Sequence, residues 1–307
     1  MSDKTQDEQH GDLWIDWLLK GRHSPKNMRY MRQSQAEIES YADRVLQHAK
    51  LEPNDTMVDV GAGEGLVSLK AIDRIGPSLR VILTDISQPL LNHAEKLATE
   101  RGVANQCTFL QCSAHQLTAI ASESVDVVIT RAALAYVEDK QTAFQEFFRI
   151  LKPGGRISLA EPVFRDDAIT ASVMRSLMES QIAMAGKPDP FTRLTHIWRS
   201  SQFPDDQHKI ATNALTNYTE RDFVQWAMAF GFKGIHLELH IDVKPSFVDW
   251  DTFLETSPHP YAPTLQTIMQ EKFTPEERQL FADVMKPIIE SDSSTSNYRV
   301  AYLSAQK

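Results

Sequence analysis

The sequence predicts an α/β protein with a doubly wound sheet of seven strands. Short apolar segments alternate with segments whose apolar residues recur every three or four positions, and short turns join them. The apolar run at 125–130 is rich in β-branched residues, which is typical of a strand covered on both faces of a parallel sheet. The expected strands are residues 57–60, 80–84, 107–111, 125–130, 156–159, 235–243 and 298–304.

Helices are predicted between most of these strands. Residues 38–49 repeat the helical period before the first strand, and residues 66–72 are predicted as a helix directly after it. Ser87 can cap the helix that follows the second strand, and Gly102 is placed to end it. A helix over 140–151 precedes the fifth strand, and Lys-Pro-Gly-Gly at 152–155 is expected to be the turn between them. This order of elements implies parallel strands with helices on both faces of the sheet.

Two segments interrupt the alternation, because they show helical patterns and no convincing strand. We expect these insertions to fold together as a lid. Trp14 and Trp17 lie at helical spacing near the start of the chain, and we expect them to pack into the core rather than close over a ligand. The predicted division is a helical segment at 1–50 with a frayed tail over 1–11, an α/β core at 51–163, a helical insertion at 164–217, more core at 218–245, a second helical insertion at 246–296 and a last core strand at 297–307.

The composition is ordinary for a globular protein, with 42% hydrophobic and 24% charged residues. The net charge of −9 argues against a nucleic acid as partner, because proteins that grip a phosphate backbone usually have a basic surface. The N-terminal segment is polar and acidic, and no apolar run approaches about 18 residues. The sequence therefore predicts neither a secretion signal nor a membrane span, and we expect a cytoplasmic protein.

A glycine-rich turn follows the first strand. Residues 58–65 read Val-Asp-Val-Gly-Ala-Gly-Glu-Gly, and glycines at such a turn let the backbone approach a ligand because no Cβ intervenes. Dinucleotide-binding enzymes use a related turn but require Gly or Ala five positions after the first glycine, where this chain has Leu66. Asp59, two residues before Gly61, favours a cationic ligand group over a pyrophosphate, which it would repel.

Two further polar groups follow the next strands. Asp85 ends the second strand, 24 positions after Gly61, where a carboxylate can accept hydrogen bonds from both hydroxyls of a ribose. Ser113 follows the third strand and could bond the edge of an adenine ring. Because open α/β sheets bind ligands at the carboxyl ends of their strands, these groups predict a nucleoside-like ligand across the first two strands.

Together these segments resemble the class I S-adenosylmethionine-dependent methyltransferases, in particular the UbiE-like branch that acts on small molecules and quinone precursors. Residues 59–65 match the family's first motif, Asp85 its ribose acid and 112–114 its adenine segment, while 130–131 and 143–155 match its fourth-strand region. The resemblance implies the Rossmann-like fold of that family, with an antiparallel last strand inserted beside the sixth. The segments covered are roughly residues 38–163, 219–243 and 298–304.

The resemblance also implies S-adenosylmethionine as the cofactor and no metal ion. Family members commonly carry an aspartate where this chain has Ser113, so adenine recognition here rests on a hydroxyl or on backbone groups. The fourth strand ends in Thr-Arg-Ala-Ala, unlike the Asn-Pro-Pro-Tyr of enzymes that methylate amino groups of nucleic acids or glutamine, which disfavours those acceptors. The residues placed against the cofactor are Asp59, Gly61, Ala62, Gly63, Asp85, Ile86, Ser113, Ala114 and Arg131.

The resulting hypothesis is in-line methyl transfer to a small, partly apolar metabolite through oxygen, nitrogen or carbon. A base is optional for this reaction, and the candidates are His115, Tyr136, His196 and His259. A structural role also explains Tyr136, His196 and His259. Two alternatives stay open at this point. One is an NAD(P)-dependent oxidoreductase of Rossmann type, and the other is a subunit that binds S-adenosylmethionine without turnover. The sequence also leaves the oligomeric state open.

Overall fold

The computed structural model describes residues 12–21 and 27–307, so the tail expected over 1–11 lies outside the described residues. The strands are β1 (Thr56–Val60), β2 (Arg80–Asp85), β3 (Cys107–Gln111), β4 (Val125–Arg131), β5 (Leu151–Pro162), β6 (Lys233–Pro245) and β7 (Thr295–Gln306). They form a seven-stranded sheet in the order β3-β2-β1-β4-β5-β7-β6. The first five strands run parallel, and β7 runs antiparallel between β5 and β6. The predicted fold class is confirmed, including the place of the last strand.

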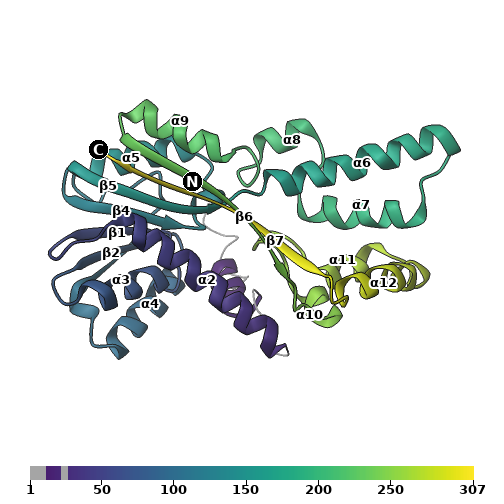
Figure 1. Ribbon diagram of the computed structural model, residues 1–307, viewed down its shortest axis with the longest axis horizontal. Coiled ribbons are helices and arrows are strands. Elements are labelled where there is room, and N and C mark those ends of the chain that lie inside the picture. The colour runs from purple at the N-terminus through teal and green to yellow at the C-terminus, as the bar shows by residue number, and fades with distance from the viewer. Residues whose placement is uncertain (1–11, 22–26) are drawn as a thin grey trace, which may run out of the picture.

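Helices cover both faces of this sheet (Figure 1). On one face lie α2 (Met28–Ala49), α3 (Leu66–Ile75) and α4 (Gln88–Glu100), and on the other lie α5 (Lys140–Ile150) and α9 (Glu220–Phe230). In β4, Val127 and Ile129 pack with the first group and Val128 with the second, which explains why this strand is almost wholly apolar. None of the helices in the described part of the chain could span a membrane.

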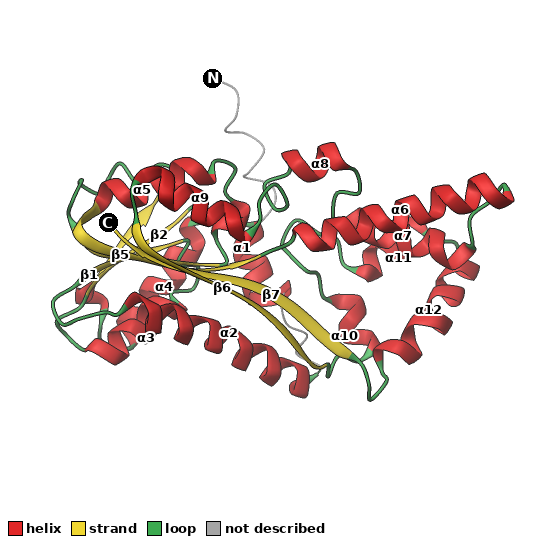
Figure 2. Ribbon diagram, turned by 45° about the horizontal axis from the view of Figure 1, so that its top comes forward, coloured by secondary structure: helices red, strands yellow, loops and turns green. Residues whose placement is uncertain are grey.

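The two insertions form a lobe beside the carboxyl ends of the strands. The first contains α6 (Arg165–Ala185), α7 (Pro190–Gln202) and α8 (Gln207–Thr212), and the second contains α10 (Trp250–Glu255), α11 (Leu265–Lys272) and α12 (Pro275–Ile289). β6 and β7 pair with each other beyond the rest of the sheet and carry the second insertion at their far end (Figure 2). The insertions share a core in which Leu194 of α7 packs with Leu265 and Phe281 of the second insertion.

β5 begins earlier than the sequence predicts. Residues 152–155, expected to be a turn, are part of this strand, and the register between β4 and β5 shifts between Val125 and Val127. The Nζ atom of Lys152 lies 2.8 and 2.9 Å from the carboxylate oxygens of Asp126 on the neighbouring strand. These contacts keep the glycine-containing segment paired, so that it forms an irregular, bulged start of the strand.

The shared core of the insertions depends on Phe281, which is fully buried against the rings of Phe191, Trp198 and Phe273. We expect Phe281→Ala to lower the free energy of unfolding by about 3–5 kcal/mol, the range for truncating a buried phenylalanine. Ile288→Ala, at an exposed position of the same helix, should change it by less than about 0.5 kcal/mol. Urea denaturation measures both values, and equal losses would contradict a common core.

Candidate active site

The turn after β1 brings its backbone against the loop that follows β4. Gly61 and Gly63 have φ values of +69° and +57°, in the left-handed region that favours glycine. A Cβ added at Gly61 would lie 2.3 Å from the Cβ of Ala133. The N–H of Ala62 donates to the carbonyl oxygen of Thr84 in β2, 2.9 Å away. The ends of β1, β2 and β4 therefore meet at a junction where only glycine fits at position 61.

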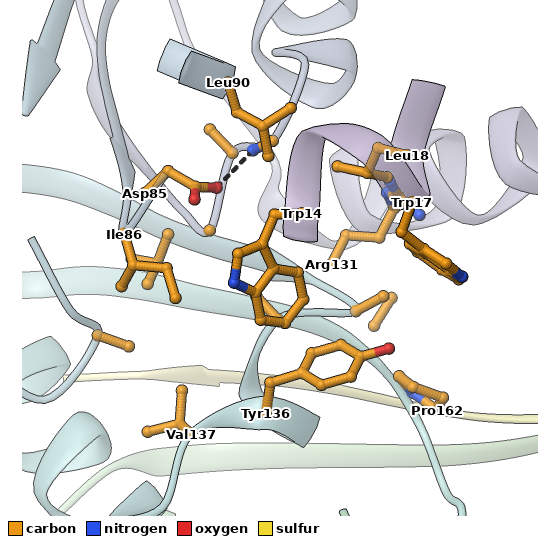
Figure 3. A pocket seen from close by; sticks show the side chains of 18 of the residues that line it. Trp14, Trp17, Leu18, Asp85, Ile86, Leu90, Arg131, Tyr136, Val137 and Pro162 are labelled. Atoms are coloured by element: carbon orange, nitrogen blue, oxygen red, sulfur yellow. Dashed lines mark hydrogen bonds between the residues drawn. The ribbon is translucent and has the colours of Figure 1, made fainter. Parts of the chain in front are cut away.

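Asp85, at the end of β2, is held by the same turn. Its carboxylate is largely buried and accepts backbone hydrogen bonds from Gly63 and Ser87, each 2.9 Å long. Burial raises the pKa of this carboxyl group above its usual range. Each oxygen keeps a further lone pair, so the group can accept two hydroxyl donors from a ligand. Ile86 follows it and lines the same pocket, with 51% of its surface exposed (Figure 3).

Asp59 lies apart from this pocket. Its side chain is buried, accepts a hydrogen bond from Oγ of Ser68 at 2.7 Å and is not among the residues that line the cavity. Burial raises its pKa to about 6. The structure thus places this acid beneath the glycine turn, against α3, rather than toward a ligand. The acid of the motif that does line the pocket is Glu64, which no sequence pattern singled out.

Arg131 ends β4 and lines the pocket (Figure 3). Its Nε atom is buried and has no hydrogen-bond partner among the residues that the structure describes. Most buried donors in folded proteins are paired, so an unpaired one in a cavity indicates a partner that comes with the ligand. A carboxylate is the group that a guanidinium binds best. Arg131 therefore lines the pocket as predicted, and its unpaired donor favours a ligand with an anionic group.

The loop after β3 supplies a mixed surface to the pocket, from Ser113 and Ala114. Oγ of Ser113 lies 2.9 Å from Nδ1 of His115, which also lines the pocket, so this hydroxyl already has a partner. Ala114, Ile86 and Leu90 present apolar atoms to the same space. This part of the pocket can hold a flat ring between apolar side chains, with polar groups at the ring edge.

Aromatic side chains form another part of the wall. Trp14 packs edge-on against Tyr136, with ring centroids 4.9 Å apart, and Figure 3 shows it between Asp85 and Tyr136. The prediction that Trp14 and Trp17 pack into the core is wrong, because both line the pocket. The N-terminal helix α1 (Leu13–Asp16) is held over the strand ends, where Oγ of Ser87 donates to the carboxylate of Asp12 at 2.6 Å.

A buried acid fixes the loop that carries Tyr136. The carboxylate of Glu161, in β5, is fully buried and accepts hydrogen bonds from Oγ1 of Thr130 at 2.6 Å and from the N–H groups of Ala133 and Ala135 at 3.3 Å. Burial raises its pKa. Glu161 is a positioning residue that the sequence analysis missed. The available signal was an acid directly after the apolar residues Leu159 and Ala160 of the strand, because a buried carboxylate needs donors nearby.

Of the four candidate bases, the structure brings Tyr136 and His115 to the pocket. His196 lies in α7, where its Nε2 is 2.9 Å from the carboxylate of Asp205, and it lines neither this pocket nor the neighbouring cavity. His259 is buried, its Nε2 lies 2.9 Å from the carbonyl oxygen of Gln202, and it borders that neighbouring cavity. The pocket itself is one cavity of about 400 Å³ that contains both the glycine turn and the aromatic wall.

A family model of the methyltransferase domain matches residues 51–216, more than half of the chain. The chain belongs to the class I S-adenosylmethionine-dependent methyltransferases. Among solved structures, a putative methyltransferase from Bacillus halodurans C-125 aligns with a TM-score of 0.52 at 17% identity, over 87% of this chain and 99% of that one, and shows the same fold. Neither finding supports the nicotinamide alternative.

Two curated relatives illustrate how the acceptors differ. The chain is 33% identical over 118 residues to the tRNA 5-carboxymethoxyuridine methyltransferase of Escherichia coli K12, covering 38% of this chain and 43% of that protein. It is 29% identical over 137 residues to the ubiquinone/menaquinone biosynthesis C-methyltransferase UbiE of Ectopseudomonas mendocina, covering 45% of this chain and 53% of that protein. The chain thus matches about half the length of these curated relatives.

The pocket of this methyltransferase fits the predicted cofactor. S-adenosylmethionine carries a ribose, an adenine, and an amino-acid end with one ammonium and one carboxylate group. Asp85 offers acceptors for the ribose hydroxyls, and Nε of Arg131, which has no partner in the described part of the chain, suits the carboxylate. Glu64 supplies the negative charge that an ammonium group requires. These residues, with the glycine turn that leaves room for the ligand, are the ones that would hold the cofactor.

The approach of the glycine turn to Ala133 predicts a large effect of a single methyl group. We expect Gly61→Ala to weaken binding of S-adenosylhomocysteine about tenfold or more, because the added Cβ must displace the loop after β4. Gly76→Ala is the matched control, since Gly76 has a φ of +88° but nothing within 4 Å of an added Cβ. Its backbone, at φ +88° and ψ −160°, has a conformation that essentially only glycine adopts, so the variant should lose about 1–3 kcal/mol of stability and keep its affinity. Calorimetric titration that finds both variants unimpaired would contradict the close contact.

The buried carboxyl group of Asp59 predicts a pH-dependent stability. Its folded-state pKa of about 6 exceeds the usual value of 3.8, so between these values the folded state binds the proton more tightly than the unfolded state. Stability therefore falls as the pH rises from about 4 to about 6, by about 3 kcal/mol from this group. Asp59→Asn removes the titration and keeps an acceptor for Ser68. Urea unfolding between pH 4 and 7 should give a flatter profile for the variant, and parallel profiles would refute the assignment.

Proposed function

We propose that the protein transfers a methyl group from S-adenosylmethionine to a small, partly apolar acceptor, through oxygen, nitrogen or carbon. The observation that carries this proposal is the single cavity that contains the glycine turn, Asp85 and the aromatic side chains of Trp14 and Tyr136. A donor bound at the turn and an acceptor bound against the aromatic wall would share one enclosed space. That arrangement is what a direct transfer between two bound molecules requires.

The size and charge of the pocket favour a small acceptor over a nucleic acid. A cavity of about 400 Å³ lies within the usual range of small-molecule sites. Carboxylates of Glu64, Asp85 and Glu138 line it, and the chain has a net charge of −9, both of which oppose a phosphate backbone. The tRNA acceptor named for the Escherichia coli relative is therefore the less favoured alternative for this chain.

Methyl transfer from S-adenosylmethionine requires the protein mainly to bind and orient the two reactants. S-adenosylmethionine supplies a methyl group that its sulfonium already activates. The chain aligns the acceptor and excludes water, and Trp14 of the N-terminal helix and Pro258 of the second insertion both line the pocket. Tyr136 lines the pocket on a loop that Glu161 holds in place, so its hydroxyl is the candidate to accept or relay a proton from the acceptor.

Methyl labelling of cell extracts tests this function. The purified protein is incubated with methyl-labelled S-adenosylmethionine and an extract that has been separated into small metabolites and tRNA. We expect label in the small-molecule fraction and none in tRNA. Label only in tRNA would contradict the proposed small-molecule acceptor and identify tRNA as the acceptor. Cofactor affinity without label in either fraction would support a subunit that binds S-adenosylmethionine without turnover.

Loss of the carboxylate that is proposed to hold the ribose should weaken cofactor binding. We expect Asp85→Ala to lower the affinity for S-adenosylhomocysteine about 100-fold, because two hydrogen bonds to a charged group are lost. Asp73→Ala is the control, since Asp73 is an exposed acid that pairs with Arg101 on the surface. Its affinity should match that of the unmodified protein in calorimetric titration. An Asp85→Ala variant that binds normally would remove the ribose assignment.

A further inference from the structure

A second cavity, of about 650 Å³, adjoins the cofactor pocket. Tyr136 and Glu138 line both spaces, so the two cavities meet at the loop after β4. The rest of the wall comes mainly from residues 200–204 and 212–215 of the first insertion and from His259 of the second. The second cavity therefore lies between the loop that carries Tyr136 and the lobe that the insertions form.

His259, which lines this cavity, carries a buried hydrogen-bond acceptor. Its side chain is 2% exposed, and its Nε2 lies 2.9 Å from the carbonyl oxygen of Gln202. A carbonyl oxygen only accepts, so Nε2 carries the ring proton and Nδ1 holds a lone pair. Burial lowers the pKa of this imidazole, which keeps the ring neutral. Nδ1 is buried and has no hydrogen-bond partner in the described part of the chain.

An unpaired buried acceptor beside a cavity favours a ligand that donates to it, because the donor satisfies an atom that is already removed from water. The surroundings of His259 are aromatic. Its ring centroid lies 5.1 Å from that of Phe203 and 6.4 Å from that of Tyr261, and both of these residues line the cavity. Flat rings pack well against such side chains. A ring compound with one hydrogen-bond donor thus matches both the shape and the polarity of the wall.

We propose that the second cavity, termed here the His259 cavity, binds the part of the methyl acceptor that lies away from the methylated atom. This part is an aromatic ring whose hydroxyl or N–H group donates a hydrogen bond to Nδ1 of His259. The inference rests on the proposed function, since Tyr136 joins this cavity to the pocket in which methyl transfer would occur. His259 then determines which acceptor is bound and takes no part in the transfer itself.

Phenol and toluene are suitable probes, because they have similar rings and only phenol has a donor. The protein is labelled with 15N-histidine and saturated with S-adenosylhomocysteine, so that the cofactor pocket is filled. We expect phenol to shift the signal of the unprotonated ring nitrogen of His259 and toluene to leave it unchanged. His259→Phe, which identifies that signal by its loss, should bind phenol about 3- to 10-fold more weakly, as expected for one hydrogen bond.

Two further variants complete the test. His208→Phe places the same substitution at an exposed histidine of α8 outside the cavity wall and should bind phenol normally. Ala214→Trp fills the cavity from a lining position and should abolish phenol binding while S-adenosylhomocysteine binds as before. Phenol that binds His259→Phe as tightly as the unmodified protein, or shifts no signal of His259, would overturn the inference and leave the proposed function standing. Failure to bind S-adenosylhomocysteine would instead count against the proposed function.

Discussion

The site depends on the close approach of two loops, the glycine turn after β1 and the loop after β4. Gly61 has no Cβ, and this absence lets Ala133 pack against it. The loop after β4 is strained, since Ala132 has a φ of +52° in the left-handed region that alanine rarely adopts. Glu161 offsets that strain by accepting hydrogen bonds from the N–H groups of Ala133 and Ala135, which would otherwise be left unpaired near the core. The cofactor side and the aromatic side therefore share one cavity.

Buried acids recur around this junction, and each has local donors. Asp59 is paired with Ser68, Asp85 with two backbone N–H groups, and Glu161 with a hydroxyl and two N–H groups. Burial raises the pKa of all three carboxyl groups, so the hydrogen bonds only partly compensate for lost hydration. Asp85 differs in that it lines the cavity, where a ligand can supply the remaining donors.

Much of the cofactor side could be predicted from the sequence, because its signals are local. The glycine turn, Asp85 and the succession of strands along the chain follow from period and spacing along short segments, while the antiparallel place of β7 is implied by the family resemblance. The direction in which the Asp59 side chain points could not be predicted, because it is set by a hydrogen bond from Ser68 in the next helix. Which ring nitrogen of His259 carries the proton depends on a carbonyl group 57 residues away in the sequence. The role of Trp14 depends on where its own short helix packs against the rest of the protein. These contacts belong to the tertiary structure. A single sequence does not reveal them, so it favours a purely structural role for such residues.

The buried ammonium group of Lys140 links the loop that carries Tyr136 to the first insertion. Nζ of Lys140, at the start of α5, donates to the carbonyl oxygens of Val137 and Ala214, each 2.7 Å away. Burial lowers the pKa of this ammonium group to about 8, so the contact is made at a cost in hydration. Val137 follows Tyr136, and Ala214 lines the His259 cavity. Because the insertions also share the core around Phe281, a change, in either insertion, of the residues that line the His259 cavity acts on a wall that both insertions hold together. The lining of the His259 cavity can thus change through the insertions while the junction of Gly61 and Ala133 stays fixed.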